Sequence, residues 1–311
     1  MKNLSNKQLY LYTTLGAIFA NFLWGTAFPV LKIVYKDMGI ASSDFGDTIA
    51  FISIRFFLAG LILLGVALFK KLPVLKLTKS QWLSIVILGI FNTTIQYFFF
   101  NIGVNNTTGI KASILGQIGI FFSVILAHFI YTNDKITKAK ALGLTLGFIG
   151  LIVVNLGKGT DGFFSFSLVG EGFMIFSGVT SALAMFIVKK IGPKIPTLVY
   201  TSWQMIIGSV LLYLLGIYSG GSLTSLHFTP LSIGLLFYLA LLSSIAFWIW
   251  YTVLQYRKIG EISLFKFVVP VVGTFLTAVF IPEETLLPAH IIGLLFVSIG
   301  IIIVNRKPKS E

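Results

Sequence analysis

The chain has 311 residues, of which 56% are hydrophobic and only 11% charged, and its mean hydropathy is +0.95. This composition excludes an ordinary soluble protein and indicates one that is solvated by a lipid bilayer. The formal net charge of +13 is divided among separate short loops, so it excludes a continuous basic groove for nucleic acid.

Apolar runs of about 20 residues recur along the whole chain, and each is long enough to cross a hydrocarbon core of roughly 30 Å as a helix. They do not alternate as barrel strands do. The first run lacks a small-residue cleavage site behind a short apolar core, so we expect it to be a retained span. We predict an all-α membrane protein of ten transmembrane helices, at 9–31, 49–69, 81–103, 109–131, 141–157, 168–188, 198–218, 231–255, 261–281 and 287–304.

Basic residues mark one side of the membrane. They precede the first span or follow an even-numbered one: Lys2, Lys7, Lys70, Lys71, Lys76, Lys79, Lys135, Lys138, Lys140, Lys189, Lys190, Lys194, Arg257, Lys258, Arg306, Lys307 and Lys309. The odd-numbered loops hold only Lys36 and Lys158 and collect acidic residues. Because cytoplasmic loops are rich in Lys and Arg, we expect a multi-pass protein of the cell (plasma or inner) membrane with both termini in the cytoplasm.

One motif occurs twice with opposite charge. The stretch "IYTNDKITKAKALGLT" at 130–145 aligns with "FIPEETLLPAHIIGLL" at 280–295, so that Asp134 matches Glu284 and Gly143 matches Gly293, but only the first copy carries lysines. A repeat of five spans enters the membrane upside down in its second copy, which explains the change of charge. We therefore predict two inverted five-helix repeats, 1–157 and 158–311, in one membrane domain. Such repeats place a binding site near the midplane and support alternating access.

Several stretches resemble the EamA-like transporters of the drug/metabolite transporter superfamily. "NFLWGTAFPVLK" at 21–32 is similar to their first helix, "ISIRFFLAGLIL" at 52–63 to their second, "SWQMIIGSVLL" at 202–212 to their seventh and "ISLFKFVVPVVGTFLTAVFIPEE" at 262–284 to their ninth. The usual Gly-Glu ending is altered, with Glu283–Glu284 in the second copy and Asn133–Asp134 in the first, and Ile120 stands at the position of Pro270. The resemblance implies an exporter of small metabolites such as amino acids or their relatives, although other members import or carry other solutes.

Polar and aromatic side chains within the spans are candidate substrate ligands. Amides, hydroxyls and small residues also join membrane helices, and for Gln96, Gln117 and Trp24 the two roles remain equal alternatives. The candidate substrate-binding residues are Asn21, Trp24, Arg55, Gln96, Tyr97, Gln117, Trp203, Gln204, Trp248, Tyr251 and Lys266.

Two cations among these candidates lie inside spans, where a charge is expensive and usually serves a pathway or a partner. Arg55 is about two turns inside span two, roughly 9 Å deep, with Asp47 as a candidate ion-pair partner. Lys266 is five residues into span nine, where it attracts a carboxylate or serves as a cytoplasmic anchor. No Asp or Glu lies deep within a span, which weakens a proton-antiport mechanism and leaves uncoupled movement open.

Catalytic motifs are missing. The chain has no G-x-x-x-x-G-K-[ST], no H-E-x-x-H and no cysteine, so we expect no enzyme, cofactor or metal site. The expected partners are a small-molecule substrate and the lipid bilayer, without nucleic acid. Glycines in spans five and ten (Gly143, Gly147, Gly150, Gly293 and Gly300) predict that these spans pack against each other or at the edge of a homodimer.

Two other functions compete with metabolite export. A multidrug exporter of the same superfamily fits the many aromatic residues but lacks a buried carboxylate for cations. A non-transporting scaffold or sensor requires an extra soluble or signalling segment, and we identify none in the sequence.

Overall fold

The computed structural model describes residues 5–41, 44–106, 115–156, 166–281 and 288–305, and these residues contain helices and connections but no strand. Seven helical segments among them are long and apolar enough to cross a membrane: Asn6–Met38, Phe45–Phe69, Lys79–Val104, Leu168–Ile191, Thr197–Tyr218, Pro230–Tyr256 and Ile259–Phe280. Shorter apolar helices cover Ile118–Ile130 and Ile291–Val304. The all-helical membrane class is therefore confirmed, whereas the count of ten spans remains a prediction.

The helices of the first half are α1 (Asn6–Met38), α2 (Phe45–Phe69), α3 (Lys79–Gly89), α4 (Gln96–Asn105), α6 (Ile118–Ile130) and α7 (Lys138–Leu156). Those of the second half are α8 (Phe173–Ile191), α9 (Thr197–Tyr218), α10 (Pro230–Tyr256), α11 (Ile259–Ile262), α12 (Val268–Phe280) and α13 (Pro288–Asn305). Several begin where the sequence supplies a cap: Ser5, Thr78 and Thr229 each accept a hydrogen bond from the backbone N–H three residues later.

Two segments of irregular helix interrupt apolar runs that the sequence shows as continuous. A π-helical segment, η1 (Ile90–Ile95), joins α3 to α4, and a 3-10 segment, η3 (Ser263–Phe267), joins α11 to α12. A second π-helical segment, η2 (Leu168–Gly172), leads into α8. Irregular turns inside helices occur frequently at functional sites. Both η1 and η3 carry candidate ligands or lie directly next to them.

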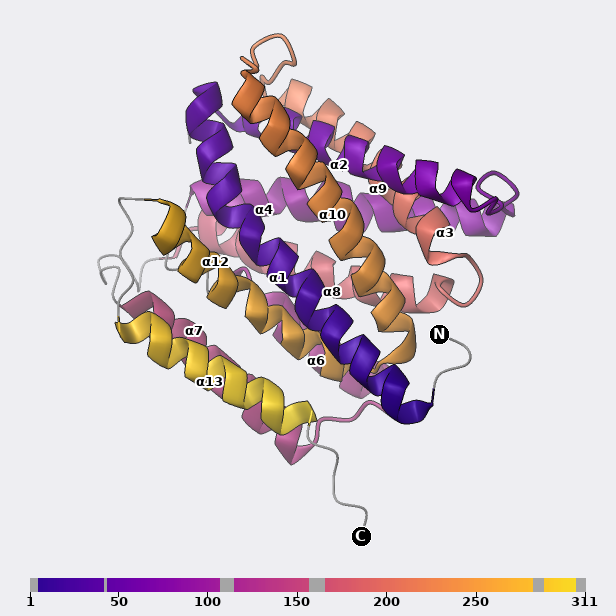
Figure 1. The fold of residues 1–311 in the computed structure, drawn as a ribbon, viewed down its shortest axis with the longest axis vertical. Helices are drawn as coiled ribbons and strands as arrows, with labels where there is room; N and C mark the ends of the chain where they lie inside the picture. The colour runs from indigo at the N-terminus through magenta and orange to yellow at the C-terminus, as the bar shows by residue number, and fades with distance from the viewer. Residues whose placement is uncertain (1–4, 42–43, 107–114, 157–165, 282–287, 306–311) are drawn as a thin grey trace.

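The helices pack in a pattern that is nearly the same for both halves (Figure 1). In the first half, α1 packs against α10 and α12, and the matching helix of the second half, α8, packs against α4 and α6. Helix α2 packs against α10, and its counterpart α9 packs against α3. Helices α2 and α9 occupy equivalent positions in the two halves and pack against each other, and so do α7 and α13. These two pairs have the most extensive contacts between helices.

Glycines allow the α7–α13 pair to approach at backbone distance. A Cβ on Gly150 would lie 2.7 Å from the carbonyl oxygen of Gly293, and one on Gly300 would lie 2.9 Å from that of Gly143. The predicted packing of these two spans is confirmed. Gly147 borders this contact as well, since a Cβ on Gly300 would lie 3.4 Å from its backbone nitrogen, whereas a Cβ on Gly147 itself would meet the ring of Phe267 in η3.

The basic turns lie at one end of the bundle. In Figure 1 α2 and α8 end on the right and α10 ends at the lower right, whereas the end of α9 and the start of α10 lie at the top. A buried ion pair of the first half contacts the second half near the basic end. Asp134, before α7, pairs with Lys140 and also accepts a hydrogen bond of 2.8 Å from the backbone N–H of Gly260 in α11.

Candidate functional site

Aromatic rings from four helices meet in the interior of the bundle. The ring of Trp24 lies 5.0 Å from Phe247 and 5.6 Å from Trp250, and Phe56 lies 4.4 Å from Tyr97 and 6.1 Å from Phe247. Spacings of three and four residues place the α10 members on one helix face. We name this set the central aromatic cluster; its members are Trp24, Phe56, Tyr97, Phe247, Trp250 and Tyr251.

Polar atoms in and around the cluster are buried without a hydrogen-bond partner. An unsatisfied buried donor or acceptor costs about 1–3 kcal/mol, and native proteins keep few of them. In the described part of the chain these atoms are Asn21 Oδ1, Trp24 Nε1, Asn92 Nδ2, Gln96 Oε1, Thr201 Oγ1, Gln204 Nε2 and the Tyr251 hydroxyl. Five of these seven residues are among the substrate ligands that the sequence predicted. Such atoms can be satisfied by water or by a polar solute.

The π-helical segment η1 supplies a residue that the predicted ligand set omitted. Asn92 is 5% exposed, and its side chain faces the Tyr251 hydroxyl of α10. The neighbouring Thr93 donates a 2.9 Å hydrogen bond to Oε1 of Gln204, which leaves the amide nitrogen of Gln204 without a partner. The amide pair Asn92 and Gln96 at i, i+4 was visible in the sequence. Its placement opposite Tyr251 depends on η1.

Arg55 lies deeper than its position in the apolar run indicated. Helix α2 begins at Phe45, so Arg55 is roughly 15 Å along the helix axis from that end. Its side chain is 5% exposed, its Nε donates to Ser243 Oγ at 2.9 Å, and its guanidinium carbon lies 5.3 Å from the ring centre of Phe56. A cation at this depth costs at least about 2.5 kcal/mol.

The ion pair expected between Arg55 and Asp47 is absent among the described contacts. Asp47 instead accepts hydrogen bonds from Ser222 N at 3.2 Å and from Ser225 Oγ at 2.6 Å, in the connection between α9 and α10. Eight residues of helix separate the two side chains by roughly 12 Å, which exceeds the reach of a salt bridge. The expectation of that pair was wrong.

Lys266 occupies the 3-10 segment η3 and also lacks a carboxylate in the described structure. Its Nζ donates to Ser181 Oγ at 3.2 Å and lies 5.7 Å from the ring centre of Trp250. The nearby acid of the sequence, Glu261, instead approaches Arg257, with 3.7 Å between Oε2 and Nε. Lys266 and Arg55 therefore reach the central aromatic cluster through different rings.

The remaining predicted ligands have other surroundings. Trp203 Nε1 donates to Val74 O at 2.9 Å, and its ring packs on Trp82, so it anchors the connection between α2 and α3. The ring of Trp248 lies 5.8 Å from Lys70 Nζ, and Gln117 is half-buried at the start of α6. The structure does not bring Trp203, Trp248 or Gln117 to the cluster by any described ring contact or hydrogen bond.

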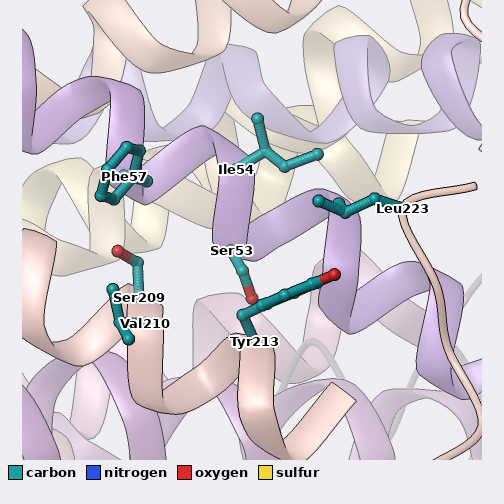
Figure 2. Close-up of a pocket in the computed structure, with 7 residues that line it drawn as sticks. All are labelled: Ser53, Ile54, Phe57, Ser209, Val210, Tyr213 and Leu223. Atoms are coloured by element: carbon teal, nitrogen blue, oxygen red, sulfur yellow. The ribbon is translucent and has the colours of Figure 1, made fainter. Parts of the chain in front are cut away.

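A groove of about 200 Å³ lies between α2 and α9 and is distinct from the cluster (Figure 2). Its lining is mainly apolar, and Phe57 and Val210 on its rim are exposed on the outside of the bundle. The two serines in it, Ser53 and Ser209, donate to carbonyls of their own helices. Among the polar groups that line the groove, only the Tyr213 hydroxyl has no hydrogen bond described. No group of three His, Asp or Glu side chains within the described ranges could hold a metal ion.

Comparison with known proteins identifies the family. The model of the EamA-like transporter family matches residues 11–156 and again residues 168–306. The chain belongs to the EamA-like transporter family. It is 26% identical to the uncharacterized transporter YvbV of Bacillus subtilis, with 96% of this chain and 93% of that protein covered.

Further relatives span a similar share of this chain. An uncharacterized transporter of Archaeoglobus fulgidus is 26% identical over 91% of this chain and 95% of its own length. The WAT1-related protein At3g02690 of Arabidopsis thaliana is 23% identical over 91% of this chain and 67% of its own. A solved crystal structure has a TM-score of 0.77 at 18% identity and covers 97% of both chains, which supports the fold. The family and these names make the chain a transporter-like membrane protein.

Proposed function

We propose that this EamA-family protein moves small polar metabolites across the cell membrane, exporting amino acids or related solutes by alternating access. In this proposal ten spans form two inverted five-helix repeats, and the solute binds at their interface near the midplane. Both termini face the cytoplasm. The substrate-binding set is the predicted one, extended by Asn92.

The matched packing of the two halves supports the inverted repeat. The contacts of α1 with α10 and α12 have counterparts in those of α8 with α4 and α6. The close approaches match as well: a Cβ on Gly25 in α1 would lie 3.1 Å from Val269 O in the α12 segment, and one on Gly119 in α6 would lie 2.9 Å from Gly178 O in α8. Two structurally equivalent halves can exchange their conformations, which is what alternating access requires.

The buried polar atoms without partners are the observation that carries the proposal. They occur in and around a cluster of aromatic rings in the bundle interior, and hydrogen bonds to a solute would satisfy them. An apolar wall with a few polar groups is the usual composition of a small-molecule site. A scaffold would have no need to keep such atoms unsatisfied.

Export of cationic drugs is the competing function, and the aromatic cluster favours it. Rings attract cations through their faces. Arg55 and Lys266 oppose it, because both cations contact these rings and neither has a carboxylate partner among the described residues. The proposal of polar, anionic or zwitterionic solutes follows from these two charges.

Transport by the purified protein in liposomes tests the proposal. The assay compares a panel of radiolabelled amino acids with cationic dyes, for the wild type and Tyr251→Phe. The Tyr251 hydroxyl is buried and has the Asn92 side chain as its described polar neighbour, so its removal should lower transport while the protein remains folded. The control Tyr213→Phe alters the outer groove and should leave transport unchanged. Preferential movement of dyes, or full transport by a folded Tyr251→Phe, would contradict the proposal.

A further inference from the structure

Arg55 is a buried cation whose described partners are all neutral. One is the Ser243 hydroxyl, bonded to Nε, and another is the ring of Phe56. Its titratable neighbours are the phenols of Tyr35 and Tyr97. The two terminal nitrogens of the guanidinium have no hydrogen-bond partner within the described structure, although they are the pair that binds a carboxylate in a fork.

The acidic residues that the structure describes are all engaged elsewhere. Each has a hydrogen-bond or ion-pair partner other than Arg55: Asp37 with Thr229, Asp44 with Ala41 N, Asp47 with Ser222 and Ser225, Asp134 with Lys140 and Gly260, Glu171 with Ser167 N, and Glu261 with Arg257. An anion for Arg55 therefore has to come from outside this set.

The charge and surroundings of Arg55 define the class of that anion. One guanidinium neutralises one carboxylate, whereas a doubly charged phosphate beside Arg55 would keep an excess negative charge there, since Lys266 reaches the cluster through a different ring, that of Trp250. Beyond the guanidinium lie the rings of Phe56 and Tyr97, 4.4 Å apart, and then Phe247. These rings favour an apolar or aromatic body attached to the carboxylate.

The described residues of this site do little to stabilise an amino group on the solute. It would carry the same charge as Arg55 and Lys266, and no described carboxylate is available to hold it. Building on the proposed function, we propose that the preferred solute is an aromatic or bulky apolar monocarboxylate. Arg55 binds its carboxylate, and the central aromatic cluster binds its body. An α-amino group is tolerated but not required.

Three probes with the same phenyl ring test the contributions of the carboxylate and the ammonium group separately. Phenylalanine carries carboxylate and ammonium, 3-phenylpropanoate only the carboxylate, and phenethylamine only the ammonium. Binding to the full chain in detergent is measured from the rise of the unfolding temperature with ligand concentration, which avoids the passive leak of weak acids through liposomes. In the wild type, 3-phenylpropanoate should bind at least as tightly as phenylalanine, and phenethylamine roughly tenfold more weakly or worse.

Substitutions at Arg55 test its role. Arg55→Gln should weaken both carboxylates by roughly tenfold or more, since a charge-assisted fork is lost, and should strengthen phenethylamine binding. A merely structural arginine would not produce that gain. Arg55→Lys should keep the order of the three probes but bind carboxylates more weakly, because a point charge replaces the fork. If Arg55→Gln does not fold, Arg55→Lys and the wild-type order give the answer.

Three results would overturn the inference: unchanged affinities in a folded Arg55→Gln, wild-type binding of phenethylamine as tight as that of 3-phenylpropanoate, or loss of carboxylate binding in Lys266→Met but not in Arg55→Gln. These outcomes are distinct from failure of the proposed function, which would appear as a lack of transport by the wild type in liposomes. A protein that carries amino acids but ignores the Arg55 substitutions would contradict only the assignment of Arg55.

Discussion

At the scale of single residues, many short hydroxyls are satisfied locally whereas amides often keep one polar atom unpaired, and Thr201 Oγ1 is an exception among the hydroxyls. Short hydroxyls bond to a carbonyl of their own helix: Thr13 Oγ1 to Leu9 O at 2.8 Å, and Ser123 Oγ to Gly119 O at 2.7 Å. An amide has two polar atoms, and one bond of this kind leaves the other unpaired, as in Asn21, whose Nδ2 donates to Ala17 O while Oδ1 has no partner. Amides and indoles are therefore better indicators of a solute site than serines or threonines.

Lys266 provides a prediction at this scale. In Lys266→Met the charge next to Trp250 and Ser181 is lost, and affinity for anionic solutes should fall while neutral analogues are still carried. Lys266→Arg should retain the anion preference if charge alone matters. Competition among anionic, zwitterionic and neutral analogues in the liposome assay measures this change. A well-expressed Met variant with unaltered preference would place Lys266 outside the site and make it an anchor.

At the scale of helices and their connections, glycines and one buried ion pair set how the halves meet. The contact between α7 and α13 is formed by backbone against backbone at Gly150 and Gly300. The connection before α7 is attached to α11 of the other half through Asp134, which is 2% exposed, and Lys140, which is 5% exposed. Both features join segments that are far apart in the sequence.

Gly150→Leu should separate α7 from α13. The new Cβ would start 2.7 Å from a backbone oxygen that cannot rotate away, so we expect a loss of at least about 1–3 kcal/mol in stability. Gly65→Leu on α2 is the matched control, because a Cβ there meets no atom within 4 Å. Thermal unfolding in detergent compares the two variants. Equal unfolding temperatures would mean that the glycine contact does not matter for stability.

Asp134→Asn should be more harmful than its small change in size suggests. It leaves Lys140 buried without a counter-charge, and breaking a buried pair costs about 3–5 kcal/mol. The double variant Asp134→Asn with Lys140→Met removes the isolated charge and should recover part of that loss. Glu261→Gln is the control, since its pair with Arg257 is partly exposed and such pairs contribute about 0–1 kcal/mol. A single variant as stable as the wild type would show that the pair is dispensable.

At the scale of the whole molecule, the sequence predicted most helices but not their irregularities. The expected spans 198–218 and 231–255 agree with α9 (Thr197–Tyr218) and α10 (Pro230–Tyr256), because apolar runs coincide with helices in a membrane. Helix α1 continues past its apolar run to Met38, where Gly39 in the left-handed conformation ends it. The η1 and η3 segments are local departures from regular α-helix, which the periodicity of an apolar run does not encode. The sequence suggested Asp47 as the partner of Arg55 because both lie on a similar face of one helix. The actual partners of Asp47, Ser222 and Ser225, come from a distant part of the chain.

The distribution of lysines predicts the orientation of the whole bundle. Lys76 and Thr224 are exposed in connections at the two ends, and the chain has no cysteine. With Lys76→Cys and Thr224→Cys made singly, a membrane-impermeant thiol reagent should label position 224 in whole cells and position 76 only after lysis. The opposite labelling pattern would invert the proposed topology.

Four of the five tryptophans form two pairs that lie in different surroundings. Trp24 and Trp250 lie 5.6 Å apart in the central aromatic cluster, whereas Trp82 and Trp203 form a separate pair beside the connection between α2 and α3. Indole emission shifts with the polarity of its surroundings, so a solute entering the cluster should change the fluorescence of the first pair and not of the second. The protein thus contains its own spectroscopic reporter of occupancy. Trp24→Phe combined with Trp250→Phe should abolish that signal, and Trp82→Phe should retain it.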